Sequence, residues 1–356
     1  DTGIKKELAD INIDVDETSI PGFIDRLYKP ITIRTKLKGI FDDRIEIRSS
    51  YRGIDKTTFV YPTMVSKDIY NPFNDCTLAR LPSFFTKIGK QWEISAGRWE
   101  LKSSLVVPGD VIIREGAELR MSKGVYLAVK GSVEMLGTRL SPIILEGSDL
   151  SSGWSGLYVL GDANTHSRLE NVIFRNTTGV ADGLLSLTGG VNFYKGKVDI
   201  RNVFFEGTIA EDALNIVEAV VEINQLRVED TYSDGFDCDY CIGSISNSNF
   251  YSIGGDGLDF SGSDLQLKNI SFRKVVDKAF SVGEASSVVI HNSEMRDVGV
   301  GIAVKDGSSA SIQGCSIADY KLFAAMTYSK KNHYYGYSSL ILEDCTIEGQ
   351  RPSFAS

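Results

Sequence analysis

The chain has 356 residues, of which 42% are hydrophobic and 24% are charged; this composition indicates a packed core and excludes a disordered chain. The formal net charge of −9 argues against a nucleic-acid partner, and the absence of any apolar run of about 18 residues argues against a membrane-spanning helix. Frequent glycine (34), rare proline (8), 17 Phe and 15 Tyr combine turn-forming and strand-forming residues, which favours an all-β fold.

Residues 1–90 lack the repeat that organises the rest of the chain. Residues 31–35 and 44–48 alternate apolar and polar side chains, as half-buried strands do. We therefore predict a small β-rich cap or accessory region over residues 1–90, because the end of a stacked β structure must be covered to prevent edge-to-edge pairing. The chain begins at Asp1 with no secretory leader, so we expect a mature form or an excised piece.

The segment after residue 213 repeats every 22 residues, and each row of the repeat begins with a large apolar residue. The five row starts are Leu214, Phe236, Leu258, Phe280 and Ile302. The third position of each row is also apolar or cysteine, and this alternation predicts a strand whose alternate side chains point inward. Three short strands in each period are typical of a right-handed parallel β-helix, whose stacked turns share one core. A leucine-rich repeat has a similar period, but its L-x-x-L-x-L spacing is missing. We predict the β-helix over residues 91–356.

A recurring asparagine marks a second position of the repeat. It precedes a strand whose fourth residue is large and apolar, and asparagine readily adopts the left-handed conformation of a tight turn. Stacked asparagine side chains can also hydrogen-bond along the column. Longer intervals predict two insertions, around residues 181–190 and 330–337. The marked residues are Asn171, Asn202, Asn247, Asn269 and Asn292.

Five cysteines are present, and Cys238 and Cys241 form a C-x-x-C motif. A zinc site would need a second such pair or a nearby histidine, and the sequence has neither. We interpret these two cysteines as small buried residues of the β stack.

Acidic residues gather in adjacent rows, where residues 22 apart become neighbours about 4.8 Å apart. Positions 2 and 4 of a row are expected to point outward if positions 1 and 3 point inward. Like charges at about 5 Å repel by about 1 kcal/mol or more, so a surface selected for solubility would intersperse the two signs. The cluster therefore predicts shared protons or a bound cation, which are features of functional sites. The clustered acids are Asp234, Asp237, Asp239, Asp256 and Asp259, and Asp212 and Lys278 share the column of Asp234.

The same rows resemble the polygalacturonase-type glycoside hydrolases, which are right-handed β-helices that cleave pectin. That family carries N-T-D-G, D-D, G-H-G and R-I-K on successive turns, and here S-D-G-F-D at 233–237 and G-D-G-L-D at 255–259 take the first two places. D-K-A-F-S-V-G at 277–283 takes the third, with Lys278 in place of the histidine, and I-A-V-K at 302–305 takes the last, with Ala303 in place of the arginine. The resemblance implies a hydrolase acting on an acidic polysaccharide.

Hydrolysis of a glycosidic bond uses one carboxylic acid to protonate the leaving oxygen and one carboxylate to activate water or attack the sugar. We predict Asp256 as the general acid, because Asp234 and Lys278 flank it in its column. Asp237 and Asp259 are the predicted base pair for water.

Lys278 and Lys305 are predicted to bind the carboxylate of an acidic sugar or to restrain an ionised aspartate. Further polar and aromatic residues near this face are predicted to contact substrate, because aromatic rings can stack on sugar rings. These predicted substrate contacts are Asp239, Tyr232, Tyr240, Tyr251, Glu284, His333 and Tyr335.

Two other functions fit the same residues. In a polysaccharide lyase or uronate epimerase, Lys278, Lys305 or His333 would remove the proton at C5 while a cation such as Ca²⁺, held by the acids, neutralised the sugar carboxylate. The D-P-H-D motif of alginate epimerases and the W-I-D-H motif of pectate lyases do not occur.

In a non-catalytic surface or adhesin β-helix, the acids would only bind Ca²⁺, whereas a hydrolase requires no cofactor. We expect a monomer and, by analogy with this fold, a secreted, periplasmic or cell-surface protein.

Overall fold

The computed structural model of the chain describes residues 45–51, 54–60, 81–149, 151–182, 185–331, 334, 336–349 and 352–355. The chain divides into two units, Asp1–Ile69 and Tyr70–Ser356. In the first unit, β1 (Ile45–Tyr51) and β2 (Ile54–Val60) form an antiparallel pair. Strand β1 contains most of the alternating segment at residues 44–48, whereas the segment at 31–35 lies outside the described residues.

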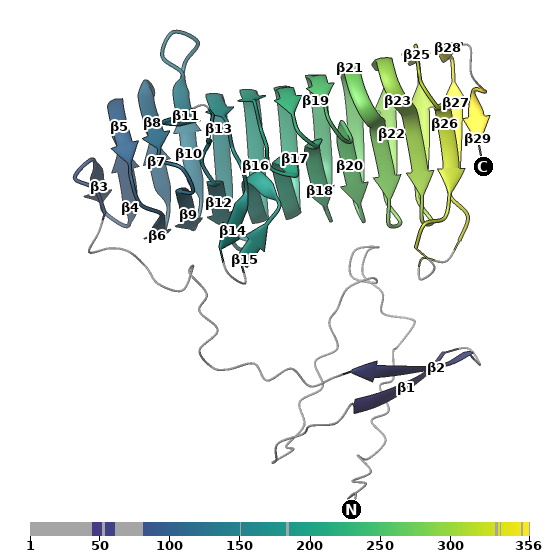
Figure 1. Cartoon of the computed structure of the whole chain (residues 1–356), viewed down its shortest axis with the longest axis horizontal. Helices are drawn as coiled ribbons and strands as arrows, with labels where there is room; N and C mark the ends of the chain where they lie inside the picture. Colours follow the sequence, from purple (N-terminus) through teal and green to yellow (C-terminus); the bar gives the residue numbers. More distant parts are fainter. Residues whose placement is uncertain are drawn as a thin grey trace, which may run out of the picture. The chain divides into compact units, whose positions relative to one another are not determined.

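The second unit is a parallel β-solenoid of about ten turns with about 23 residues per turn, in which the strands stack along one axis from β3 to β29 (Figure 1). No helix in the described residues is long and apolar enough to cross a membrane. Each turn contributes strands to three faces, which the pairing registers define.

The first face comprises β6 (Leu105–Pro108), β9 (Tyr126–Lys130), β12 (Gly156–Leu160), β18 (Asp234–Asp239), β20 (Leu258–Ser261), β26 (Phe323–Tyr328), β29 (Phe354–Ala355), the starts of β16 (Gly189–Glu206) and β17 (Asp212–Thr231), and the ends of β21 (Asp264–Gly283) and β23 (Glu294–Lys305). The second face comprises β4 (Gln91–Ile94), β7 (Val111–Ile113), β10 (Val133–Leu136), β22 (Ser287–His291), β24 (Ser309–Gln313), β27 (Ser339–Glu343), the starts of β13 (His166–Arg175), β19 (Ile242–Ile253) and β21, and the middle parts of β16 and β17. The third face comprises β5 (Gly97–Leu101), β8 (Ala117–Met121), β11 (Ile143–Gly147), β25 (Ser316–Ala318), β28 (Thr346–Glu348) and the remaining parts of the long strands.

The predicted inward column exists in the structure. Leu214, Phe236, Leu258, Phe280 and Ile302 pair one with the next across successive turns of the first face. All five side chains are 0% exposed, as are the third-position residues of the same rows. A 22-residue period therefore stacks equivalent apolar residues into one continuous core, which confirms the predicted parallel β-helix.

The recurring asparagines occupy the predicted left-handed turns. Asn171 has φ 50° and Asn202 has φ 51°, and the Asn202 Nδ2 donates to Asn171 Oδ1 at 2.6 Å. Asn269 donates in the same way to Asn247 at 2.9 Å. These side-chain bonds hold the corner between the second and third faces.

Both predicted insertions are present. The first is an antiparallel hairpin of β14 (Val180–Asp182) and β15 (Leu185–Leu187). The second is the loop between β26 and β27, called here the 329–338 loop. The carboxylate of Asp306 fixes the start of this loop, because its Oδ1 accepts from the backbone N–H groups of Lys330 at 2.6 Å and Lys331 at 2.7 Å.

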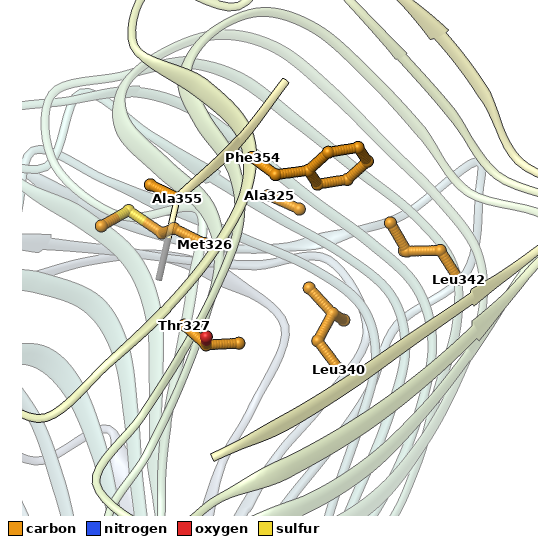
Figure 2. Close-up of a pocket in the computed structure, with 7 residues that line it drawn as sticks. All are labelled: Ala325, Met326, Thr327, Leu340, Leu342, Phe354 and Ala355. Carbon is orange, nitrogen blue, oxygen red and sulfur yellow. The ribbon is translucent and has the colours of Figure 1, made fainter. Parts of the chain in front are cut away.

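The two ends of the solenoid differ. At the N-terminal end, β3 (Phe85–Ile88) folds back antiparallel on β4, and Phe84 stacks on Trp99 there. At the C-terminal end, a cavity of about 380 Å³ opens among apolar side chains of the last two turns (Figure 2). Its lining residues are Ala325, Met326, Thr327, Leu340, Leu342, Phe354 and Ala355, none of which can transfer a proton near neutral pH, so this cavity is not a catalytic site.

The sequence predicted that Cys238 and Cys241 are buried, but it did not predict a bond between them. Both are buried in the core, as expected, but they are joined by a disulfide bond. The bend between them, where Tyr240 has φ 56°, brings the two side chains back to the same interior. This disulfide links the end of β18 to the start of β19.

Candidate functional site

The acid cluster lies on the first face, where β18, β20 and the ends of β21 and β23 lie on adjacent turns. Asp237 pairs with Asp259 in the register of β18 and β20, and Asp212 pairs with Asp234 one turn earlier. The structure thus places all six predicted catalytic residues on one face: Asp234, Asp237, Asp256, Asp259, Lys278 and Lys305. We use the term acid cluster for these four aspartates together with Asp212 and Asp239.

The outward positions are less exposed than expected from alternation alone. Ser281, in the column of Asp237 and Asp259, is 0% exposed, and Lys305 is only 5% exposed. Burial has a local cause, because the Lys305 side chain runs across the preceding turn and its Nζ donates to Ser281 Oγ at 2.9 Å. The acid cluster is therefore a half-buried polar layer and not a flat exposed ladder.

Asp256 and Lys278 form the most enclosed ion pair of the site. The Lys278 Nζ donates to Asp256 Oδ1 at 2.9 Å and Oδ2 at 3.2 Å, and the Lys278 backbone N–H also donates to Oδ1 at 3.0 Å. The same Nζ contacts Asp277 Oδ2 at 2.5 Å. Burial raises the pKa of Asp256 to about 6 against the opposing charge of Lys278. Burial disfavours the charge on Lys278, but the two carboxylates together raise its pKa.

Asp234 and Asp259 lie beside this pair. Oxygens of Asp234, Asp256 and Asp259 lie within 4.8 Å of one another, and the Asp256 backbone N–H donates to Asp234 Oδ1 at 2.8 Å. Burial raises the pKa of Asp234, although this N–H stabilises its charged form. Lys305 Nζ lies 3.6 Å from Asp259 Oδ1, so a lysine charge adjoins that carboxylate.

A divalent cation fits these three aspartates poorly. Calcium takes about six to eight oxygen ligands, and Lys278 already contacts both oxygens of Asp256. A cation would have to displace this ammonium group from a buried position.

Asp237 carries a perturbed carboxyl group on this face. Burial and the neighbouring Asp239 and Asp212 raise its pKa well above the usual range. Its hydrogen bond comes from Asn215 Nδ2, at 3.5 Å from Asp237 Oδ2, and no lysine or arginine of the described residues forms an ion pair with it. Burial and its acidic neighbours therefore bias the carboxyl group of Asp237 toward the protonated form.

Asp212 makes the stability of the solenoid depend on pH. Burial and the adjacent Asp234 raise its pKa to about 7, so between about pH 4 and pH 7 the folded state binds more protons than the unfolded state, and stability falls as pH rises. We expect a lower melting temperature at about pH 7.5 than at about pH 5.5. Asp212→Asn keeps an oxygen acceptor for Asn215 Nδ2, which lies 3.3 Å from Asp212 Oδ2, and should raise stability at the higher pH by a few kcal/mol, at about 1.4 kcal/mol per pKa unit.

The measurement is thermal unfolding of both proteins across this pH range. The other raised carboxyl groups act in the same direction, so the variant should have a shallower slope and not a flat one. Equal slopes in the two proteins would contradict the assignment to Asp212.

The predicted substrate contacts are only partly brought together. Asp239 and Tyr240 lie at the end of β18, on the acid-bearing turn, and Tyr232 lies at the opposite corner, 76% exposed. The prediction for Tyr251 was wrong, because this residue does not lie near the acids. It belongs to the third face, where its hydroxyl accepts a hydrogen bond from Lys274 Nζ at 3.1 Å. A bend separates it from the acids although it is close in sequence. His333 and Tyr335 lie outside the described residues.

Glu284 has a different role from the one predicted. It is buried, and its Oε2 accepts from Ser261 Oγ at 3.0 Å while its Oε1 contacts Lys331 Nζ at 2.5 Å. The side chain thereby ties the 329–338 loop to the first face, so it is already engaged and is poorly placed to bind a sugar. The loop thus reaches the acid-bearing face.

Three contributors to the site were missing from the predicted set. Asp212 shares the column of Asp234 at the 22-residue spacing, so its place was visible in the sequence. Asp306 was likewise visible at the fifth row position, but its role in holding the 329–338 loop was not. The 22-residue spacing places Lys278, and not its neighbour Asp277, in the column of Asp234. Only the structure shows that the two side chains are in contact.

Comparisons with known proteins found one matching family model and several similar solved structures. A family model described as right handed beta helix region matches residues 212–354, which confirms the predicted handedness. Among solved structures, a variant of the periplasmic alginate epimerase AlgG is 12% identical, with 78% of this chain and 81% of that chain covered and a TM-score of 0.39. An alginate lyase from Paenibacillus sp. str. FPU-7 is 11% identical, with coverages of 67% and 93% and a TM-score of 0.26. The catalytic domain of a GH87 α-1,3-glucanase variant is 9% identical, with coverages of 75% and 61% and a TM-score of 0.32. No curated protein matches the sequence.

Proposed function

We propose that this protein cleaves glycosidic bonds in a polysaccharide, with one protonated and one ionised carboxyl group of the acid cluster. The observation that carries this proposal is the contrast between Asp237 and Asp259, which pair on adjacent turns. Burial among carboxylates raises the pKa of Asp237, whereas a lysine lies 3.6 Å from Asp259. Glycoside hydrolysis uses one carboxyl group that donates a proton and a second that acts as a carboxylate. The raised pKa of Asp237 suits the first role, and the position of Asp259 beside a lysine suits the second.

Asp237 suits the role of proton donor better than Asp256, which the sequence favoured. Asp256 is 5% exposed, and both of its oxygens contact the Lys278 ammonium group, so a glycosidic oxygen has little access to it. Asp237 is only partly buried and its main neighbours are other acids. In the proposal, Asp256 holds Lys278 in place and Asp237 protonates the leaving oxygen.

Asp259 then acts from the neighbouring turn as the ionised group. Adjacent strands are about 4.8 Å apart, which is closer to the carboxyl separation of about 5 Å in retaining enzymes than to the 6.5–9.5 Å of inverting enzymes. We therefore propose that Asp259 attacks the anomeric carbon and that water releases the sugar in a second step, with Asp237 returning as the base. Proton NMR of the first products would show retained anomeric configuration.

A lyase or epimerase with a lysine base is less compatible with the site. Such a base must be neutral to remove the proton at C5, but the carboxylates around Lys278 and Lys305 raise the pKa of both ammonium groups despite their burial. Burial also raises the pKa of Tyr328, beside Lys305. The carboxyl groups are thus better suited to acid–base work near neutral pH than the lysines.

A non-catalytic surface role is also less compatible. An acid ladder displayed for Ca²⁺ would be exposed, whereas Asp212 and Asp256 are buried here. Burial of carboxyl groups destabilises the fold, so a structural protein gains nothing from retaining them.

The charge of the substrate follows from the ion pairs. Lys278 contacts Asp256 and Asp277, Lys305 lies near Asp259, and Lys331 contacts Glu284. Each of these lysines is already neutralised, which favours a neutral or basic glycan at the acid cluster over the acidic one expected from the sequence. An acidic polysaccharide remains a prediction that the same experiment tests.

The test is incubation of the protein with matched panels of acidic, neutral and amino-sugar polysaccharides. A hydrolase produces new reducing ends without new ultraviolet absorbance, whereas elimination by a lyase produces an absorbing unsaturated sugar. We expect the first result, with activity falling as pH rises because Asp237 must be protonated and its pKa is raised. Ultraviolet absorbance on any substrate would overturn the hydrolase proposal, and inactivity on all three panels would favour a structural role.

We also propose that the protein functions outside the cytosol, as a secreted, periplasmic or cell-surface protein. The Cys238–Cys241 disulfide supports this location, because structural disulfides persist in oxidising compartments and are rare in reducing ones.

A further inference from the structure

Cys315 and Cys345 occupy equivalent positions on the last two turns of the solenoid. Cys315 immediately precedes β25 and Cys345 immediately precedes β28, and Ser316 pairs with Thr346 in the parallel register of these strands. The backbone N–H of Thr346 donates to the carbonyl oxygen of Cys315 at 2.9 Å. Cys315 and Cys345 therefore lie at the same corner of two successive turns.

The two thiols differ in exposure. Cys315 is buried and Cys345 is partly exposed. The Cys315 Sγ also contacts the carbonyl oxygen of Gln313 at 3.6 Å, and the Cys345 Sγ contacts that of Glu343 at 3.2 Å. Both side chains therefore turn inward at the same corner, one above the other.

We propose that Cys315 and Cys345 form a disulfide bond that clasps the last turn of the solenoid to the turn before it. Stacked strands place equivalent Cα atoms about 4.8 Å apart, within the range of about 4.4–6.8 Å that a disulfide spans. The disulfide would stabilise the end of the described solenoid, where β27, β28 and β29 pair with a preceding turn and where β27 and β29 border the cavity of Figure 2.

A small-molecule disulfide, such as oxidised glutathione, is the oxidant. The thiolate of the more accessible Cys345 attacks one glutathione sulfur, which forms a mixed disulfide and releases one glutathione thiolate. Burial raises the pKa of the Cys315 thiol to about 11, so this thiol loses its proton to water as it attacks the Cys345 sulfur and releases the second glutathione. Two protein S–H bonds are lost, one S–S bond forms, and the two electrons and two protons pass to two molecules of reduced glutathione.

The experiment uses the full chain carrying Cys76→Ser, because Cys76 is the remaining cysteine that could compete. After incubation with oxidised glutathione, the protein is digested without reduction and its peptides are analysed by mass spectrometry. We expect a peptide pair linked through Cys315 and Cys345 and the loss of both thiols from a titration in denaturant. A persistent glutathione adduct on Cys345, or two titratable thiols after prolonged oxidation, would overturn the proposal.

Cys315→Ser in the same background is the matched control, because serine occupies the corresponding position one turn earlier at Ser293, where its hydroxyl accepts from the Ile270 N–H. This variant should keep the fold and accumulate the glutathione adduct on Cys345. Limited proteolysis gives a second readout: the last turn should be cut several-fold more slowly in the oxidised protein than in the reduced one. The Cys315→Ser/Cys345→Ser double variant should show no such difference, and equal cleavage rates in the oxidised and reduced parent would contradict a clasp.

Discussion

Phe280→Asp should prevent the solenoid from folding. Phe280 is 0% exposed, pairs with Leu258 and Ile302 on the adjacent turns, and packs edge-on against Phe272 with 4.7 Å between ring centroids. Loss of a buried phenylalanine costs about 3–5 kcal/mol, and burying an unpaired carboxylate costs several more. Together these costs approach the total stability of about 5–15 kcal/mol of a typical domain. Circular dichroism and size-exclusion chromatography of the purified protein measure the outcome.

The control for this substitution lies on the same strand. Val276 also belongs to β21 but is 63% exposed, so Val276→Asp adds the same charge to the same strand without burying it. We expect this variant to fold with a melting temperature close to that of the parent. A folded Phe280→Asp protein with parent-like strand content would refute the buried column.

The predictability of this column depends on the regular period. Because 22 residues make one turn, a sequence written in rows places Leu258, Phe280 and Ile302 side by side, and alternation then assigns their direction. The exposure of the outward-pointing side chains cannot be predicted from the 22-residue period in the same way. Ser281 is covered by a lysine from the next turn, 24 residues later, and the conformation of that long side chain is set by its charge partners and not by the repeat.

The bends between the faces of the solenoid explain the other differences between the predicted and the observed positions of side chains. Tyr251 is close in sequence to Asp256, but the turn between them moves Tyr251 to another face, so sequence proximity overstated its role. The Cys238–Cys241 disulfide also depends on a corner, at Tyr240. The conformation of each bend decides which neighbours meet, and the apolar pattern does not contain that information.

Asp237→Asn should lower the rate of polysaccharide cleavage by about 100-fold to 10,000-fold, the usual contribution of a general acid. The substitution removes the donated proton but preserves the size of the side chain. It should also leave the melting temperature unchanged or raise it near neutral pH, because burial among Asp239, Asp212 and other carboxyl groups raises the pKa of Asp237 and thereby disfavours its ionisation in the folded state. Reducing-end assays and thermal unfolding of the same preparation separate the two effects.

Two further variants locate the effect. Asp264→Asn changes an exposed aspartate at the start of β21 on the second face and should retain full activity. Asp256→Asn removes the charge that holds Lys278 and tests the competing assignment of the proton donor. If Asp256→Asn, and not Asp237→Asn, abolished the alkaline fall in the pH profile, the proton donor would be Asp256. If Asp237→Asn kept full activity on the substrate identified by the panel, carboxylate catalysis by this pair would be excluded, because an amide cannot donate the proton that the leaving oxygen requires.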